Sequence, residues 1–433
     1  MGTIESGTKL IHAWADIVFK NFAINKTMSN VRQRRPIHTP QDDQIEDEDE
    51  RRSRDSGFWT HAAFVGLLSA LILTPVILII IPSPIDPVSY SFKPRPELVG
   101  PLEPNSHLQK SEHIYEGQVL GPESIVVEGE HIYTGTLDGK ILHIYKGQVQ
   151  VLAKFGKEPC GGFDNEPTCG RPLGMRLDKN GYLYVIDTYL GLYQVNVATG
   201  DFVLLWPTTA EINGRASKFL NDLTIASDGM IYMTDSSAKW DRRHNRYCIF
   251  EGEATGRLIS YDPITNTTKE LASGLAFANG VQISRNEEYL LICETTWARI
   301  FKYHLKGPKK GTMEVFMDNL PGLPDNIRLS SAGGYWIGIA TLRSKGYEFM
   351  ANKPWLRKLV AKIISQETII KLVPKYGLIL EISSEGEIIR SLHDPTATKV
   401  PSVSEVEDKD GVLYLGSYFL PHMSRLYLGR LKT

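Results

Sequence analysis

Oxygen-bearing side chains recur at one register of a motif that the chain repeats six times. The six motifs are GPESIVV, RPLGMRL, FLNDLTI, FANGVQI, LPDNIRL and SVSEVED. We aligned them on the apolar residues Ile125, Met175, Leu223, Val281, Ile327 and Val406. Two places before these stand Glu123, Leu173, Asn221, Asn279, Asp325 and Ser404. Carboxylates and amides therefore dominate this register.

Converging carboxylate and amide oxygens are the ligands of a hard cation. Calcium binds about six to eight oxygens and tolerates irregular geometry. We predict that Glu123, Asn221, Asn279 and Asp325 bind Ca²⁺, with Asn326 and water completing the shell. Because no Cys or His occupies the register, zinc and copper are not expected. The competing interpretation is that Asn and Asp serve turns at strand starts, but their agreement across the repeat favours a metal site.

The elements that must position these residues are short strands. From about residue 110, apolar and aromatic runs alternate with Gly, Asp and Asn, as in HIYTGTLDGKILHIY and GYLYVIDTYLGLYQV. The motifs recur at intervals of about 50, 50, 60, 45 and 80 residues. Six such units predict an all-β, six-bladed β-propeller over 110–433, whose innermost strands line a central channel.

The long last interval contains a helical pattern. In 346–376, Trp355, Leu359 and Ile363 recur at helical spacing. The basic residues of the other face are Lys353, Arg357, Lys358 and Lys362. We predict a helical insertion between blades five and six. Two roles stay open: a cap packed on the propeller, or a basic face that touches the membrane surface or gates the channel mouth.

A single apolar segment precedes the propeller. The run AAFVGLLSALILTPVILIII carries no charge and suffices to cross roughly 30 Å of hydrocarbon. A cleaved signal peptide fits less well, because the run lies far from the N-terminus. We predict a disordered cytosolic tail (1–57), a transmembrane anchor (58–81) and a linker (82–109).

The flanks of the anchor predict its direction. Arg51, Arg52 and Arg54 precede it, and no basic residue follows before Lys93. The positive-inside rule then gives a single-pass type II membrane protein with a lumenal or extracellular propeller. The plasma membrane and the endoplasmic reticulum both fit this topology.

Other features agree with an oxidising compartment. Cys160 and Cys169 stand close enough in sequence to form a disulfide, whereas Cys248 and Cys293 are expected to be buried thiols. Asn266 begins the glycosylation triplet NTT in a predicted turn. The net charge of −2 gives no basic field, so we expect no nucleic-acid partner.

Several motifs resemble the strictosidine synthase-like family of six-bladed propellers. They are CGRPLGMR, FLNDLTI, TDSS, FANGVQ, ETTWARI, PGLPDNIR, GGYWIGI, SLHDP and DGVLYLGS. The resemblance implies a membrane-anchored protein with arylesterase-like activity. The wider superfamily holds a catalytic calcium in the channel, and its ligand pattern maps onto Glu123, Asn221, Asn279, Asp325 and Asn326. A cysteine pair ahead of GRPLG implies the Cys160–Cys169 disulfide.

We therefore expect calcium-dependent hydrolysis of small carboxylic (aryl) esters. Asp325 would act as nucleophile or as base for a water, and Glu123 would hold the ion. Strictosidine synthase uses a blade-six glutamate where this chain has Ser404, with Glu405 beside it, so we expect no condensation chemistry. The alternative is a non-catalytic cell-surface binding propeller with structural calcium. The expected partners are a small ester and, through the anchor, a membrane.

Overall fold

The computed structural model describes residues 45–431, with side chains from residue 58 on. The chain divides into two units, Met1–Pro84 and Ile85–Thr433.

The first unit contains one long helix, α2 (Ile45–Ile80). Its segment Phe58–Ile80 contains an 18-residue stretch with a mean hydropathy of 2.7 and, by length and composition, suffices to cross a membrane. The predicted anchor is confirmed as an apolar helix. However, residues 45–57, which we predicted to be disordered, are helical, because their many Glu and Arg favour helix. The rest of the predicted tail lies outside the described residues.

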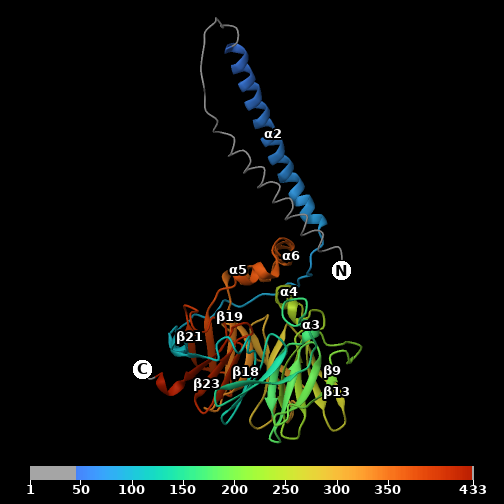
Figure 1. Cartoon of the computed structure of the whole chain (residues 1–433), viewed down its shortest axis with the longest axis vertical. Coiled ribbons are helices and arrows are strands. Elements are labelled where there is room, and N and C mark those ends of the chain that lie inside the picture. Colours follow the sequence, from blue (N-terminus) through green and yellow to red (C-terminus); the bar gives the residue numbers. More distant parts are fainter. Residues whose placement is uncertain (1–44, 432–433) are drawn as a thin grey trace. The chain divides into compact units, whose positions relative to one another are not determined.

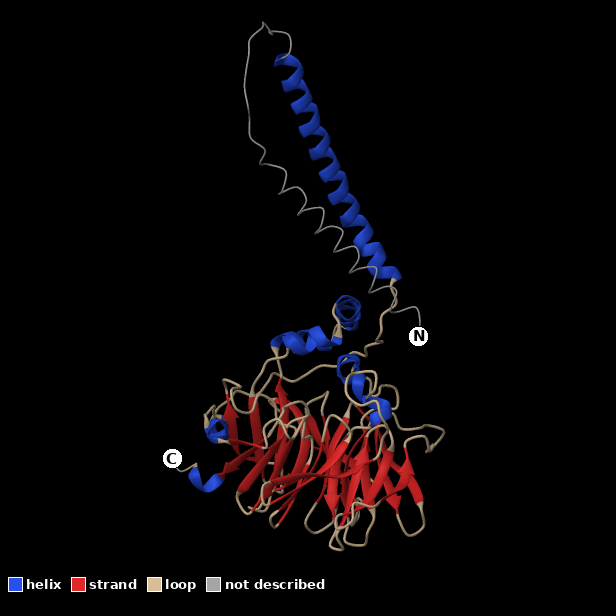
Figure 2. Cartoon of the chain, in the orientation of Figure 1, coloured by secondary structure: helices blue, strands red, loops and turns tan. Residues whose placement is uncertain are grey.

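The second unit is a six-bladed β-propeller of antiparallel four-stranded sheets, as predicted (Figures 1 and 2). Blade one contains β2 (Ile125–Glu128), β3 (His131–Gly135), β4 (Lys140–Tyr145) and β5 (Gln148–Lys154). Blade two contains β6 (Pro172–Leu177), β7 (Tyr182–Asp187), β8 (Gly191–Asn196) and β9 (Phe202–Pro207). Blade three contains β10 (Leu220–Ile225), β11 (Ile231–Asp235), β12 (Gly256–Asp262) and β13 (Thr267–Leu275).

The remaining blades follow the same order, and the last one closes the ring. Blade four contains β14 (Ala278–Ile283), β15 (Tyr289–Glu294), β16 (Arg299–His304) and β17 (Met313–Met317). Blade five contains β18 (Gly322–Leu329), β19 (Tyr335–Leu342), β20 (Gly377–Ile382) and β21 (Ile388–Asp394). Blade six contains β22 (Glu405–Lys409), β23 (Val412–Gly416), β24 (Met423–Tyr427) and β1 (Glu112–Ile114), which pairs with β24.

Every repeat motif contributes the innermost strand of its blade. These strands, β2, β6, β10, β14, β18 and β22, contact one another around the ring. Their aligned apolar residues are almost completely buried between blades. Burying these side chains supplies much of the hydrophobic stabilisation of the ring. Because each apolar residue packs between blades, the carboxylate and amide side chains two places before it lie at the central channel.

The helical insertion exists, but its predicted position between blades five and six is corrected. Helices α5 (Lys345–Ala351), α6 (Pro354–Ile363) and α7 (Gln366–Leu372) lie between β19 and β20, inside blade five. The motifs mark only innermost strands, so the interval could not reveal which connection carried the extra residues. Helices α5 and α6 lie on the same side of the propeller as α4 (Asn245–Glu251), which connects β11 to β12 (Figure 1).

Most of the predicted linker belongs to the propeller unit. Ile85, Tyr90, Leu102 and Leu108 are buried, and short 3-10 turns occur at Gly100–Leu102 and His107–Lys110. The scattered prolines of this stretch hid its packing from pattern reasoning. The predicted disulfide joins Cys160 to Cys169, at the end of α3 (Glu166–Cys169). Cys248 and Cys293 are free and buried, as predicted.

Candidate active site

Four of the innermost strands have an irregularity in their pairing at the positions of the predicted register residues. Strands β6, β10, β14 and β18 each shift register against the next strand of their blade. The shifts fall at residues 173–174, 221–222, 279–280 and 325–326. A β-bulge bends a strand and redirects its side chains. The local irregularity thus lies where the repeat register carries Leu173, Asn221, Asn279 and Asp325.

Two glycines let neighbouring bulges approach each other. A Cβ atom on Gly174 would lie 2.4 Å from Oδ1 of Asp222. A Cβ atom on Gly280 would lie 2.6 Å from Cα of Asn326. Both distances are shorter than real contacts allow, so only glycine permits this spacing of the innermost strands.

The five predicted cation ligands are all buried. Glu123 and Asn221 are each 4% exposed, Asn279 3%, Asp325 7% and Asn326 1%. Asn326 Nδ2 donates to Glu123 Oε1 at 3.0 Å, across the ring from blade five to blade one. In blade two Leu173 packs in an apolar cluster with Phe219 and Phe277. In blade six Ser404 donates its Oγ hydrogen to the backbone carbonyl of Glu123 at 3.0 Å.

Two hydroxyl groups fix the orientation of the asparagine amides. Asn221 Nδ2 donates to Ser236 Oγ at 2.9 Å, and Ser236 Oγ donates to the carbonyl of Ala278 at 2.6 Å. Asn279 Nδ2 donates to Thr295 Oγ1 at 3.0 Å, and Thr295 Oγ1 donates to the carbonyl of Pro324 at 2.7 Å. Because each amide nitrogen is occupied, the amide oxygen of each asparagine remains available.

Five buried side-chain oxygens of this cluster have no hydrogen-bond partner. They are Glu123 Oε2, Asn221 Oδ1, Asn279 Oδ1, Asn326 Oδ1 and Glu405 Oε1. Buried polar atoms are rarely left unpaired, and each exception calls for a specific cause such as an ion or water. The unpaired atoms come from blades one, three, four, five and six, and all are acceptors.

Burial and neighbouring carboxylates raise the pKa values of Glu123 and Asp325. Burial raises the pKa of Glu123 well above its usual range, and the charges of Asp325, Glu405 and Asp222 raise it further. Burial raises the pKa of Asp325 to about 7; hydrogen bonding to the Asn279 amide opposes this rise, and Glu405 adds to it. A cation among these carboxyl groups would favour their ionised forms.

Three further charged residues were not identified from the sequence. Arg328 Nη1 lies 2.7 Å from Asp222 Oδ2, and Arg328 Nη2 lies 2.6 Å from Glu405 Oε2. The side chains of Asp222, Arg328 and Glu405 are buried. Asp222 and Glu405 each directly follow a register residue, and Arg328 directly follows the aligned Ile327. A search of the positions beside the register would have found them.

Helix α4 covers this end of the channel. Its Cys248 and Ile249 pack with Phe219 and Phe277, the residues two places before Asn221 and Asn279. Arg246 of the same helix donates to the hydroxyl of Tyr418 at 2.7 Å. The positive charge of Arg246 lowers the pKa of Asp325, so this guanidinium faces the cluster.

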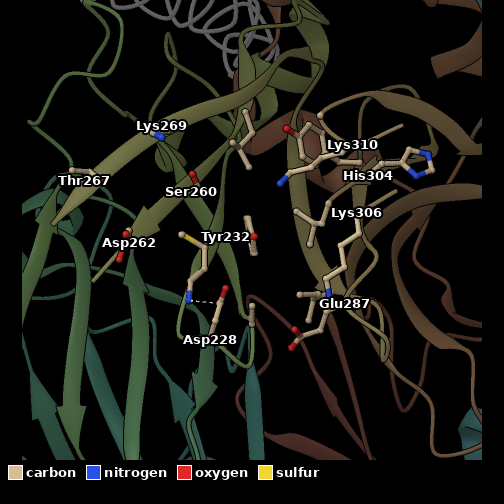
Figure 3. A pocket seen from close by; sticks show the side chains of 17 residues that line it. Asp228, Tyr232, Ser260, Asp262, Thr267, Lys269, Glu287, His304, Lys306 and Lys310 are labelled. Carbon is tan, nitrogen blue, oxygen red and sulfur yellow. Dashed lines mark hydrogen bonds between the residues drawn. The ribbon is translucent and has the colours of Figure 1, made fainter. Parts of the chain in front are cut away.

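Two hollows on the propeller are lined mainly by other residues. One, of about 1380 Å³, is lined by the carboxyl ends of innermost strands, opposite to Glu123, and includes Arg328 and Glu407. The other, of about 410 Å³, lies between blades three and four (Figure 3). In it Asp228 and Asp262 accept hydrogen bonds from backbone N–H groups of their own turns. These carboxylates serve local structure, so we assign no chemistry to this groove.

The donor set fits calcium. It combines carboxylate and amide oxygens from several blades, and one oxygen each of Glu123, Asn221, Asn279 and Asn326 accepts no hydrogen bond from the protein. Ser236 and Thr295 orient the amides of Asn221 and Asn279. Hard cations require such oxygen ligands, and second-shell hydrogen bonds orient them. The residues that would hold the ion are Glu123, Asn221, Asn279, Asp325 and Asn326.

Comparisons with known proteins define the class. Residues 221–308 match the family model described as strictosidine synthase, and residues 100–144 match strictosidine synthase-like, N-terminal. A gluconolactonase from Xanthomonas campestris superposes with a TM-score of 0.51 at 16% identity, covering 80% of this chain and 96% of that one. This likeness shows the fold alone. Fold and motifs together define a six-bladed propeller of the strictosidine synthase-like class.

Sequence comparison is more specific. The chain is 46% identical over 408 residues to adipocyte plasma membrane-associated protein of Gallus gallus, covering 92% of this chain and 98% of the relative. The human protein of that name is 43% identical over the same length, again with 92% and 98% covered. The chain belongs to the adipocyte plasma membrane-associated protein family. This membership and the apolar helix Phe58–Ile80 fit a single-pass membrane protein.

Proposed function

We propose that the channel site hydrolyses small carboxylic esters, including aryl esters, in a calcium-dependent reaction. The observation that carries the proposal is the set of buried, unpaired acceptor oxygens contributed by separate blades. A bound calcium ion would polarise the ester carbonyl and stabilise the negative charge on its oxygen. A gluconolactonase with the same fold is consistent with ester chemistry.

The residues of this chain have separate tasks in the proposed reaction. Asp325, the most exposed of the buried channel carboxylates, accepts a proton from a water molecule at its carboxylate oxygen. The water oxygen then bonds to the carbonyl carbon, the alkoxide or phenolate leaves, and Asp325 returns the proton to it. Glu123, Asn221 and Asn279 would hold the ion in place, and Arg246 contributes positive charge near Asp325.

The topology proposal follows from the flanks of the apolar helix. Arginines precede it and acidic or neutral residues follow it, which favours a cytosolic N-terminus and a lumenal or extracellular propeller. The disulfide Cys160–Cys169 is typical of such a compartment. Asn266, exposed in the turn between β12 and β13, would then accept a glycan. Glycosidase treatment of cell-derived chain should remove mass from wild type but not from Asn266→Gln.

The test is hydrolysis of an aryl acetate by the purified full chain, with and without a calcium chelator. We expect activity that is lost with the chelator and restored by calcium. Asp325→Asn should lose activity while retaining the fold. The matched control is Asp318→Asn, which removes an exposed carboxylate paired with Lys93 and should remain active. Chelator-resistant hydrolysis would refute the calcium role.

The same experiment separates the alternative, a binding propeller with structural calcium. If the wild-type chain binds calcium and is stabilised by it, but hydrolyses no ester, the site is structural. If Glu123→Gln lowers calcium affinity and activity together while the fold persists, the enzymatic proposal is supported.

A further inference from the structure

The insertion inside blade five is firmly attached on its inner side. Arg357 of α6 is completely buried and donates to the backbone carbonyls of Phe250 at 2.8 Å and Ala351 at 2.8 Å. Ala361 of α6 packs with Phe250 and Ile85 in one apolar cluster. The insertion is therefore a rigid part of the propeller rather than a loose loop.

Its outer side exposes large apolar residues. Trp355 is 65% exposed and Leu372 68%. The other large apolar side chains exposed on the three helices are Phe349, Ile363 and Ile370. Exposed apolar surface is unfavourable in water, so several large exposed apolar side chains on one short insertion indicate an interaction site. We call these five residues the apolar face of the insertion.

Lysines accompany this apolar face. The Nζ atom of Lys353 lies 3.9 Å from the centre of the Phe349 ring, and Lys358 pairs with Asp86 at 2.6 Å. Lys362 and Lys371 lie in the last turns of α6 and α7. Exposed Trp, Phe and Leu side chains flanked by lysines are typical of helices that lie in a membrane interface.

The chain enters the propeller unit at this insertion. Ile85 is buried against Ala361, and the N–H of Asp86 donates to Glu251 Oε1 at 2.6 Å. The apolar segment ends at Ile80, only five residues before Ile85. Five fully extended residues span at most about 18 Å. If Phe58–Ile80 spans a membrane, Ile85 therefore lies within about 18 Å of the end of the membrane-spanning segment.

We infer that the apolar face of the insertion docks on the lipid surface of the membrane that holds the anchor. Trp355, Phe349 and Leu372 enter the interfacial layer, and the lysines contact lipid phosphates. The inference depends on anchoring by Phe58–Ile80 and is independent of ester hydrolysis. The inner contacts make the insertion a cap on the propeller, the first of the two predicted roles, and Arg357, which was predicted on the basic face, is buried in these contacts. The inference adds contact with a membrane, made by the apolar face together with the lysines.

The test uses the full chain at one copy per lipid nanodisc. Trp355→Cys and Leu372→Cys, made singly, are labelled with an environment-sensitive fluorophore. Native thiols do not interfere, because Cys248 and Cys293 are buried and the other two cysteines form the disulfide. The matched control is Val203→Cys, at an exposed apolar residue of β9, the outermost strand of blade two.

Lipids with a quencher on the acyl chain report contact with the bilayer. We expect quenching at positions 355 and 372 at least about twofold stronger than at 203, with blue-shifted emission. Thermal unfolding of each labelled variant should match wild type, because the substituted side chains are exposed. Equal quenching at all three positions would overturn the inference. A blue shift at 355 and 372 without quenching would show that protein covers the face, and would overturn it equally.

Discussion

The hydroxyl of Thr295 provides a sharp test of how the channel presents its oxygens. It accepts a hydrogen bond from Asn279 Nδ2 at 3.0 Å and donates to the carbonyl of Pro324 at 2.7 Å. Thr295→Val keeps the shape of the side chain and removes both bonds. The amide of Asn279 then loses the acceptor that fixes its orientation, so its oxygen is no longer held in place for a cation.

The expected losses of stability and of calcium affinity in Thr295→Val follow from these two hydrogen bonds. Leaving a buried donor and acceptor unpaired costs about 1–3 kcal/mol of stability. Loss of a second-shell hydrogen bond lowers metal affinity about 10–100-fold. Thr295→Ser retains the hydroxyl and is the matched control, with affinity expected near wild type.

The assay is calcium titration of the purified full chain by calorimetry, with thermal unfolding measured in parallel. The reasoning predicts that Thr295→Val loses both stability and affinity. If Thr295→Val were less stable but bound calcium as tightly as Thr295→Ser, the hydroxyl would hold only the fold. The assignment of the Asn279 oxygen as a ligand would then be refuted.

Three further predictions concern buried groups. Asp222→Asn leaves the Arg328 guanidinium buried without one of its two carboxylate partners and should cost about 3–5 kcal/mol in urea unfolding; an unchanged midpoint would contradict this pairing. Burial lowers the pKa of His393 to about 4. Between pH values of about 6.5 and 4, His393 is therefore protonated in the unfolded chain but neutral in the folded chain. Stability should drop by about 3 kcal/mol across that window, and His393→Gln should show a shallower loss. Reduction of the Cys160–Cys169 disulfide, whose cysteines are nine residues apart, should cost about 2–3 kcal/mol, while Cys160→Ser should make stability insensitive to reductant.

The repeat made the propeller predictable from the sequence. Each blade must bury an innermost strand, so the motifs carried the apolar residue and the polar register together. The same logic predicted that Glu123 and Asn326 lie together, and they are hydrogen-bonded although 203 positions separate them in the chain. Whether these residues bind calcium remains a prediction.

The parts that failed depended on contacts that periodicity does not encode. The insertion was assigned to the wrong connection because β20 carries no motif. Arg328 was missed because an arginine after an apolar strand residue usually faces solvent. Only the assembled ring shows that it lies between Asp222 and Glu405. Ser236 and Thr295 stood within the quoted motifs TDSS and ETTWARI, but nothing in their local pattern indicated which amide each would orient.

The closure of blade six constrains how the chain can be made. Strand β1 comes from the start of the propeller, and its partner β24 ends at Tyr427. A ribosome must therefore synthesise almost the whole chain before β1 can find its partner. Until then β1 is an unpaired strand that is open to pairing with other chains. Maturation of this protein should thus be post-translational, and truncations within β24 should leave an open ring prone to aggregation.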